Sequence, residues 1–152
     1  MFKIDESLIA LDVETEDAEA LIRLLCKKLE EAGCVDSEHV QAVLEREKRF
    51  PTGLPTRPFC VAIPHGEGEG VNESALAFAR LKKSVIFKNM ANDKEELEVR
   101  MIFLIANNEP ENQVKTLRRL SEMFSKPEQL LTLSKINEPK EVMKMLKDML
   151  QN

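Results

Sequence analysis

The hydrophobic residues follow two different spacings along the first third of the chain. Residues 7–13 are mostly apolar, which predicts a first strand. From residue 18 onward the apolar side chains instead recur every three or four positions, which predicts a helix that ends at Gly33. A second helix is predicted over residues 36–48, because Asp and Ser can cap its start and Pro51 prevents its continuation.

The remainder of the chain contains further strands and then only helices. Strands are predicted over residues 59–63, 75–81, 84–87 and 97–106, with a polar turn over residues 89–94. Helices are predicted over residues 110–126, 128–133 and 137–150. Strands alternate with helices apart from a β-meander in the middle, so we expect a single α/β domain over residues 1–152. Its mixed parallel and antiparallel sheet should have about five strands, with helices on both faces.

Composition and charge exclude several classes of partner. A chain of 152 residues can bury about 70% of its unfolded surface, so neither disulfides nor metals are needed for stability. It is 43% hydrophobic and 32% charged, which is typical of a soluble globular protein. The net charge is -5 and the two signs are interspersed, so we expect no nucleic-acid partner and no direct membrane insertion.

The cysteines indicate a reducing compartment. Cys26, Cys34 and Cys60 are odd in number and form no C-x-x-C pair, and neither a signal peptide nor a long apolar segment precedes them. The sequence therefore predicts a cytoplasmic protein with free thiols.

His65 is the strongest candidate for chemistry. It follows the apolar run Val-Ala-Ile-Pro directly, and the stiff loop Pro51–Pro58 precedes that run. A neutral imidazole on a loop held by a rigid strand can accept and pass on a chemical group without a cofactor. An isolated histidine after a strand is often only a packing residue, so the position alone leaves both readings open.

Other candidate sites are weaker. No H-x-x-x-H spacing exists, so we expect no metal, and His39 at the start of a helix is predicted to be solvated. The glycine-rich residues 66–70 lack the spacing of a nucleotide-binding loop, although their N–H groups could approach a phosphoryl oxygen. A hydrolase built on Cys60 and His65 is opposed by strand alternation, which makes Cys60 a small buried hydrophobe.

Two motifs resemble those of a known family. The first is Arg46-Glu-Lys-x-Phe-Pro51-Thr-Gly-Leu, and the second is Val61-Ala-Ile-Pro-His65-Gly66. Together they resemble the enzyme IIA domain, fructose and mannitol type, of the bacterial sugar phosphotransferase system. The Pro51-Thr-Gly-Leu-Pro-Thr56 variant is most similar to the galactitol-type branch, and the likeness in organisation covers almost the whole chain.

The resemblance implies a phosphoryl carrier. His65 would take a phosphoryl group from the phosphocarrier protein HPr and donate it to a cysteine of a cognate enzyme IIB, which serves the membrane component IIC. No metal and no other cofactor is implied. The resemblance also leaves a second function open, that of a regulatory, nitrogen-related paralogue whose phosphorylation state controls a protein partner.

Arg46 and Gln113 complete the implied site. Arg46 matches the arginine of the family's R-E motif and could hold phosphoryl oxygens; the alternative is a surface ion pair with a carboxylate such as Glu45. Relatives of the mannitol and fructose type carry a second histidine at the position of Gln113, so an amide would replace it here, unless Gln113 is merely a solvated first-turn residue. Glu67 could orient the imidazole, but we expect it to be exposed.

Overall fold

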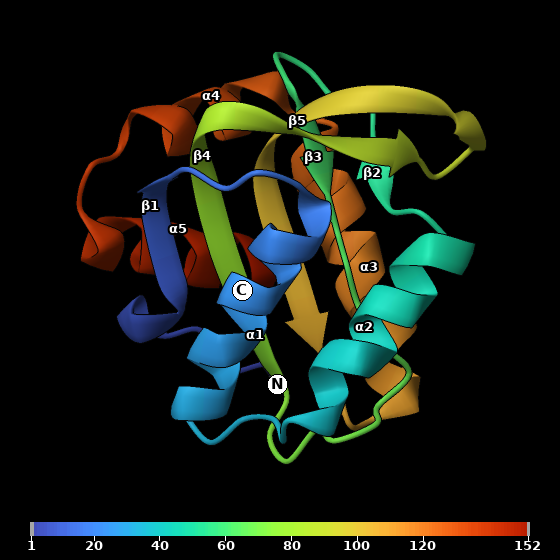
Figure 1. Cartoon of the computed structure of the whole chain (residues 1–152). Helices are drawn as coiled ribbons and strands as arrows, with labels where there is room; N and C mark the ends of the chain where they lie inside the picture. The colour runs from blue at the N-terminus through green and yellow to red at the C-terminus, as the bar shows by residue number, and fades with distance from the viewer. Residues whose placement is uncertain (1, 152) are drawn as a thin grey trace.

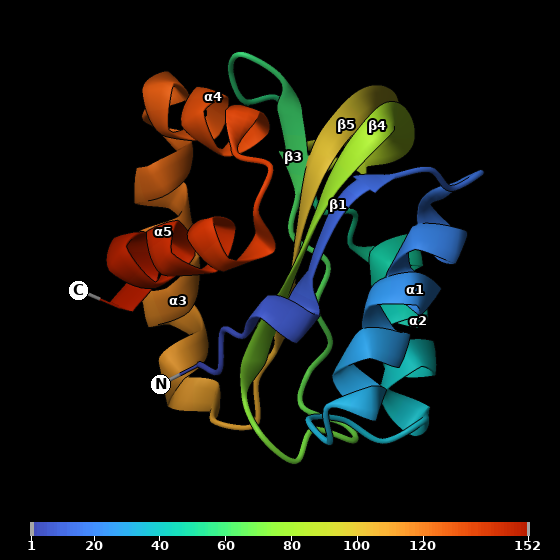
Figure 2. The ribbon, with the colours of Figure 1, turned by 90° about the vertical axis from the view of Figure 1, so that its left-hand side faces the viewer.

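The computed structural model describes residues 2–151 as a sheet between two layers of helices (Figures 1 and 2). A short 3-10 turn, Glu6–Leu8, leads into the first strand. The strands are β1 (Ile9–Val13), β2 (Gly53–Leu54), β3 (Cys60–Ala62), β4 (Ala75–Asn89) and β5 (Asn92–Ala106). The helices are α1 (Ala18–Glu31), α2 (Glu38–Arg49), α3 (Pro110–Phe124), α4 (Pro127–Lys135) and α5 (Pro139–Gln151).

The sheet is mixed, as predicted. β4 and β5 form a long antiparallel hairpin, β1 runs parallel to β4, and β3 runs parallel to β5. β2 pairs with β3 and also reaches the end of β4, where Gly53 lies opposite Asn89. A Cβ atom on Gly53 would lie 2.6 Å from the carbonyl oxygen of Lys88, so only glycine allows this close approach. These pairings, with helices on both faces, confirm the α/β class.

The hairpin corrects two predictions. The separate strands expected over 75–81 and 84–87 are one strand, β4, with an irregularity between Arg80 and Val85. The polar turn expected over 89–94 is only the two residues between the strands, because strand pairing continues to Asn89 and Asn92. Asn89 Nδ2 also donates to Glu95 Oε1 over 2.6 Å. The charged residues that suggested a turn, Asp93 and Lys94, lie at the exposed start of β5.

Alternate residues of the hairpin build two separate cores. Leu76 and Phe78 face α3, α4 and α5, whereas Ala75, Ala77 and Ala79 face α1 and α2. The rings of Phe78, Phe103 and Phe124 form a chain of tilted contacts with centroids 5.1 and 5.2 Å apart. Figure 2 shows α1 and α2 on one side of the sheet and α3, α4 and α5 on the other.

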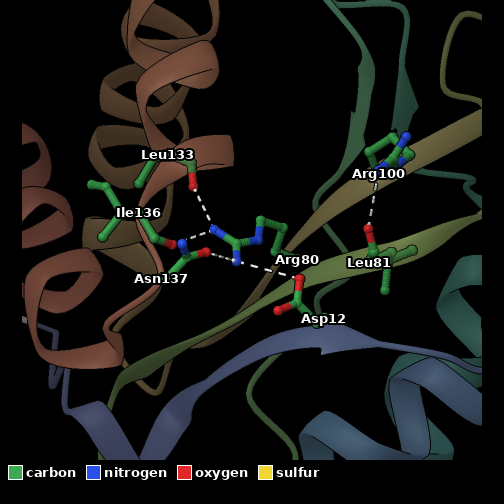
Figure 3. A network of polar contacts seen from close by, with 7 residues as sticks. All are labelled: Asp12, Arg80, Leu81, Arg100, Leu133, Ile136 and Asn137. Atoms are coloured by element: carbon green, nitrogen blue, oxygen red, sulfur yellow. Dashed lines mark hydrogen bonds and ion pairs between the residues drawn. The ribbon is translucent and has the colours of Figure 1, made fainter.

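Arg80 joins β4 to the helical layer on the α3–α5 side (Figure 3). Its Nη1 donates to the carbonyl oxygens of Leu133, over 3.1 Å, and Ile136, both at the end of α4. Its Nη2 donates to Asn137 Oδ1 over 3.3 Å and contacts Asp12 Oδ1 at 3.4 Å. A buried cation thus satisfies carbonyls that the end of a helix leaves free.

Among residues 2–151, no helix has both the length and the apolar character needed to cross a lipid bilayer. In the same part of the chain, no three metal-ligating side chains come together.

Candidate active site

His65 lies just beyond β3, at the edge of the sheet where β3 and β5 end. The backbone there is tied to β5, since the Ile105 N–H donates to the Pro64 carbonyl over 3.0 Å and His65 bridges to Ile105. The residue is 8% exposed. The carboxyl ends of neighbouring parallel strands are a common place for a binding site in an α/β fold, and His65 occupies such a place.

One hydrogen bond fixes the tautomer of the imidazole. Nδ1 of His65 lies 2.8 Å from the carbonyl oxygen of Ile63. A carbonyl can only accept, so Nδ1 carries the proton and Nε2 keeps its lone pair. Burial lowers the pKa of His65 below 6.5, with a smaller contribution from the positive charge of Arg46. The ring is therefore neutral near pH 7, with Nε2 as a nucleophilic atom.

Arg46 projects from the last turn of α2 toward the same place. Its Nη1 donates to Glu67 Oε1 over 2.7 Å, and its Cζ lies 5.1 Å from the centre of the Phe50 ring. The Glu67 side chain is 70% exposed, as expected. The sequence analysis named Glu45 as an ion-pair partner for Arg46, but the partner is Glu67. Nε of Arg46 is buried and has no hydrogen-bond partner among the described residues.

Gln113 lies in the first turn of α3 and is half-buried. Its Oε1 accepts from Asn107 Nδ2 over 2.8 Å. The orientation of Asn107 is fixed in turn, because its Oδ1 accepts from the N–H of Glu109 over 3.0 Å. The bond from Asn107 therefore leaves the amide hydrogens of Gln113 as donors for another group.

These three candidates line one pocket of about 390 Å³. They come from α2, from the loop after β3 and from α3. The other lining residues are Gly66, Glu67, Gly68, Asn107, Asn108, Pro110, Val114 and Leu117. The pocket thus brings a nucleophilic nitrogen, a cation and a neutral amide donor together, which is what an incoming phosphoryl group requires.

The prediction for His39 was wrong. This residue is 0% exposed, and its Nδ1 lies 3.0 Å from the carbonyl oxygen of Glu69. The loop 66–70 folds over the start of α2 and covers the ring, which the positive φ angles of Gly68 (104°) and Gly70 (71°) allow. Nε2 of His39 is buried without a hydrogen-bond partner among residues 2–151, and burial lowers the pKa of the ring, so His39 is neutral.

Cys60 does not form a pair with His65. It lies at the start of β3, is half-buried, and burial raises the pKa of its thiol. A thiol that stays protonated is a weak nucleophile. The structure therefore offers no support for the hydrolase alternative.

Glu47 is a site residue that sequence reasoning missed, although it belongs to the R-E motif. Its Oε2 accepts from the backbone N–H of Thr52 over 2.9 Å, and its Oε1 accepts from the Thr52 hydroxyl over 2.8 Å. Burial raises the pKa of Glu47 to about 7, although both Thr52 bonds and the charge of Arg46 oppose the shift. Glu47 and Thr52 belong to the same motif and lie five positions apart, and this spacing is the signal that could have predicted the contact.

Comparison with known proteins agrees with this geometry. Residues 3–149 match the family described as "Phosphoenolpyruvate-dependent sugar phosphotransferase system, EIIA 2". The galactitol-specific EIIA component of Escherichia coli K12 is 32% identical over 101 residues, which cover 66% of this chain and 67% of that protein.

Two solved structures share the fold. Nitrogen regulatory protein IIA-Ntr from Neisseria meningitidis is 28% identical, with a TM-score of 0.78 over 93% of this chain and 94% of that one. Enzyme IIA for mannitol from Escherichia coli, solved in complex with phosphorylated enzyme IIB, is 24% identical, with a TM-score of 0.80 over 97% of this chain and 99% of that one.

The chain is therefore a phosphotransfer component of the sugar phosphotransferase system. It belongs to the EIIA type 2 family, the fructose and mannitol type, which confirms the resemblance seen in the sequence motifs.

Proposed function

We propose that this protein accepts a phosphoryl group from phosphorylated HPr on Nε2 of His65 and donates it to a cysteine of a cognate enzyme IIB. The hydrogen bond from Nδ1 to Ile63 is the observation that carries this proposal, because it leaves Nε2 as the free lone pair. In the first step the Nε2–P bond forms while the bond between phosphorus and the donor histidine breaks. In the second step a cysteine thiolate attacks phosphorus and the Nε2–P bond breaks.

Arg46 and Gln113 have complementary roles in this proposal. The guanidinium of Arg46, which lines the same pocket as His65, neutralises charge on the equatorial phosphoryl oxygens. Gln113 donates from an uncharged amide, which holds the phosphoryl group less tightly than a second cation. A carrier has to release the group, so one cation and one neutral donor suit transfer in both steps.

Both partners would use the same surface. Phe50 is 56% exposed beside Arg46, and Val114 is 64% exposed beside Gln113. Exposed apolar side chains around a polar pocket are typical of a docking surface, and a small one permits rapid exchange of partners. The likeness to a IIA solved with phosphorylated IIB supports this docking mode. We propose a cytoplasmic location for the protein, since it would exchange the phosphoryl group with soluble HPr.

The 32% identity with a galactitol-specific component favours uptake of galactitol or a similar polyol through IIB and the membrane component IIC. A regulatory function is the second candidate, because a nitrogen regulatory IIA is 28% identical over nearly the whole chain. The transport and regulatory functions differ in the protein that accepts the phosphoryl group. A transport component passes its phosphoryl group to a galactitol-type IIB, whereas a regulator keeps it in the presence of that IIB.

The decisive experiment uses radiolabelled phospho-HPr. The wild-type protein should become a phosphoprotein that is stable in base and labile in acid, and His65→Ala should take up no label. Addition of a galactitol-type IIB should then remove the label from His65. Retained label on the His65→Ala variant, for example on His39, would overturn the assignment.

A further inference from the structure

The proposed site is divided between two segments that must keep a fixed spacing. Arg46 belongs to α2, whereas His65 follows β3. Within residues 2–151, the guanidinium bonds to the segment after β3 through Glu67 alone, and the side chain of Glu67 is 70% exposed, so this ion pair is a weak tether. Apolar packing of Val43 and Leu44 holds α2 on the sheet, but a directional contact is needed to fix the end of α2 relative to the strand that leads to His65.

Glu47 and Thr52 make that contact. The carboxylate at the end of α2 accepts two hydrogens from Thr52, over 2.9 Å from the backbone N–H and over 2.8 Å from the hydroxyl. Thr52 is 2% exposed, so water has little access to its N–H and hydroxyl groups. Two bonds between the same two residues fix both distance and orientation, which a single bond does not.

The contact continues from Thr52 to the imidazole. The carbonyl oxygen of Thr52 accepts from the N–H of Ile63 over 3.3 Å. The carbonyl oxygen of Ile63 accepts from Nδ1 of His65 over 2.8 Å. Three successive contacts thus connect the carboxylate of Glu47 to the nitrogen that sets the tautomer of His65.

We propose that Glu47 is a positioning residue of the phosphoryl-transfer site: by holding Thr52 it sets the place of the Ile63 carbonyl, and thereby the tautomer of His65 and its distance from Arg46. This role rests on the proposed function of His65. Glu47 does not touch the phosphoryl group, because its carboxylate is occupied by Thr52, and it does not line the pocket around His65.

The chemistry of the contact predicts which substitution can replace Glu47. A glutamine at this position can accept the Thr52 N–H on its oxygen and donate its amide N–H to the Thr52 hydroxyl oxygen, so both bonds survive. Alanine keeps neither bond. Glu47→Gln should therefore preserve the site and Glu47→Ala should disturb it, which separates hydrogen bonding from charge.

The first readout is the tautomer of His65, followed by ¹⁵N NMR of the imidazole nitrogens in the unphosphorylated full chain. The wild-type protein and Glu47→Gln should show a proton on Nδ1 alone. Glu47→Ala should show a mixture of both tautomers. The matched control is Glu45→Ala, which removes an exposed carboxylate from the same helix and should leave the wild-type pattern.

The second readout is the rate of phosphoryl transfer from phospho-HPr. Misplacement of reacting groups by about 1 Å can cost about 100-fold in rate, so we expect a loss of about 10-fold or more at saturating phospho-HPr for Glu47→Ala. The half-saturating concentration should stay within about twofold, because the exposed docking residues are untouched. Glu47→Gln should restore most of the rate.

Three results would overturn the positioning role. They are a folded Glu47→Ala variant with the wild-type tautomer and rate, a Glu47→Gln variant as impaired as Glu47→Ala, and a loss of rate no larger than the loss of folded protein. If Glu47→Ala does not fold, Thr52→Val removes one of the two bonds and should shift the tautomer in the same direction; an unchanged tautomer there also contradicts the proposal.

The two proposals fail in different ways. The tautomer measurement needs no phosphoryl donor, so a wild-type protein that accepts no label refutes the transfer function alone. A wild-type protein that is labelled on His65, with normal tautomer and rate in Glu47→Ala, refutes the positioning role alone.

Discussion

Arg46 and Arg80 show how differently the same side chain is used in two regions of this protein. Arg80 is almost wholly buried, and both of its terminal nitrogens are engaged by oxygen atoms of α4, β1 and the segment after α4. The side chain of Arg46 is 27% exposed at the pocket around His65, and its one ion pair among residues 2–151 is with the exposed carboxylate of Glu67. A buried cation with filled hydrogen bonds stabilises the fold, whereas a partly exposed one whose partner is a solvated carboxylate is available to an incoming anion.

The largest expected effect is on stability, from Arg80→Met. This change leaves two helix-end carbonyls without their buried partner, so we expect the free energy of unfolding to fall by about 3–5 kcal/mol. Urea denaturation followed by circular dichroism measures it. Phosphoryl transfer by the folded fraction should stay normal, and a loss below about 1 kcal/mol would mean that Arg80 is not the structural partner of α4.

The second effect is a pH dependence of the free energy of unfolding that is caused by Glu47. Because burial raises the folded-state pKa of Glu47 from 4.5 to about 7, protonation favours the folded protein. This contribution is fully present below pH 4.5 and is lost as the pH rises through about 7. Relative to Glu47→Gln, the wild-type protein should therefore lose about 3 kcal/mol between pH 4.5 and pH 8.

Urea unfolding of both proteins at the two pH values tests this. If the free energies of unfolding of the wild type and Glu47→Gln differ by the same amount at pH 4.5 and pH 8, Glu47 keeps an ordinary pKa. The expected result places the two regions in contrast, since Arg80 adds stability while the carboxylate beside Arg46 reduces it at neutral pH.

The third effect is on rate, from Arg46→Met. Removal of one preorganised donor from a developing charge typically costs about 100-fold or more, so transfer from phospho-HPr should slow by about that factor. Stability should change by less than about 1 kcal/mol, because the lost ion pair is largely exposed. Single-turnover transfer beside urea denaturation measures both quantities. Normal transfer combined with a loss of stability would show that Arg46 has a structural role like that of Arg80.

The smallest effect is expected from Gln113→Ala. An uncharged hydrogen bond contributes about 1 kcal/mol, so the transfer rate should fall by about 3- to 10-fold. Leu117→Val, a conservative change at an apolar residue of the same pocket, serves as the control and should stay near the wild-type rate. If Gln113→Ala transfers the phosphoryl group at the wild-type rate, Gln113 is an ordinary residue of the first helical turn with no role in transfer.

The sequence predicted what depends on local patterns. Helical spacing predicted α1 to α5, and strand patterning predicted β1, β3 and most of β5, because those segments bury one face or both. The two motifs led to Arg46 and His65, and the family resemblance led to Gln113; all three lie in one pocket. Their roles in transfer remain predictions until the variants are measured.

What the sequence could not predict depends on contacts between distant segments. The burial of His39 results from a loop about 30 residues away along the chain, and the partner of Arg46 is Glu67, not its neighbour Glu45. The short strand β2 forms only because Gly53 meets both β3 and β4. Periodicity describes single elements, so it carries no information about these pairings.

The most direct test of the account is to locate the phosphoryl group by ¹⁵N and ³¹P NMR after incubation with phospho-HPr. The hydrogen bond from Nδ1 to Ile63 predicts a single phosphorus bonded to Nε2 of His65, with the Nδ1 proton retained. Phosphorus on Nδ1 of His65, or on His39, would contradict the account, because either result would mean that the Ile63 carbonyl does not select the reacting nitrogen.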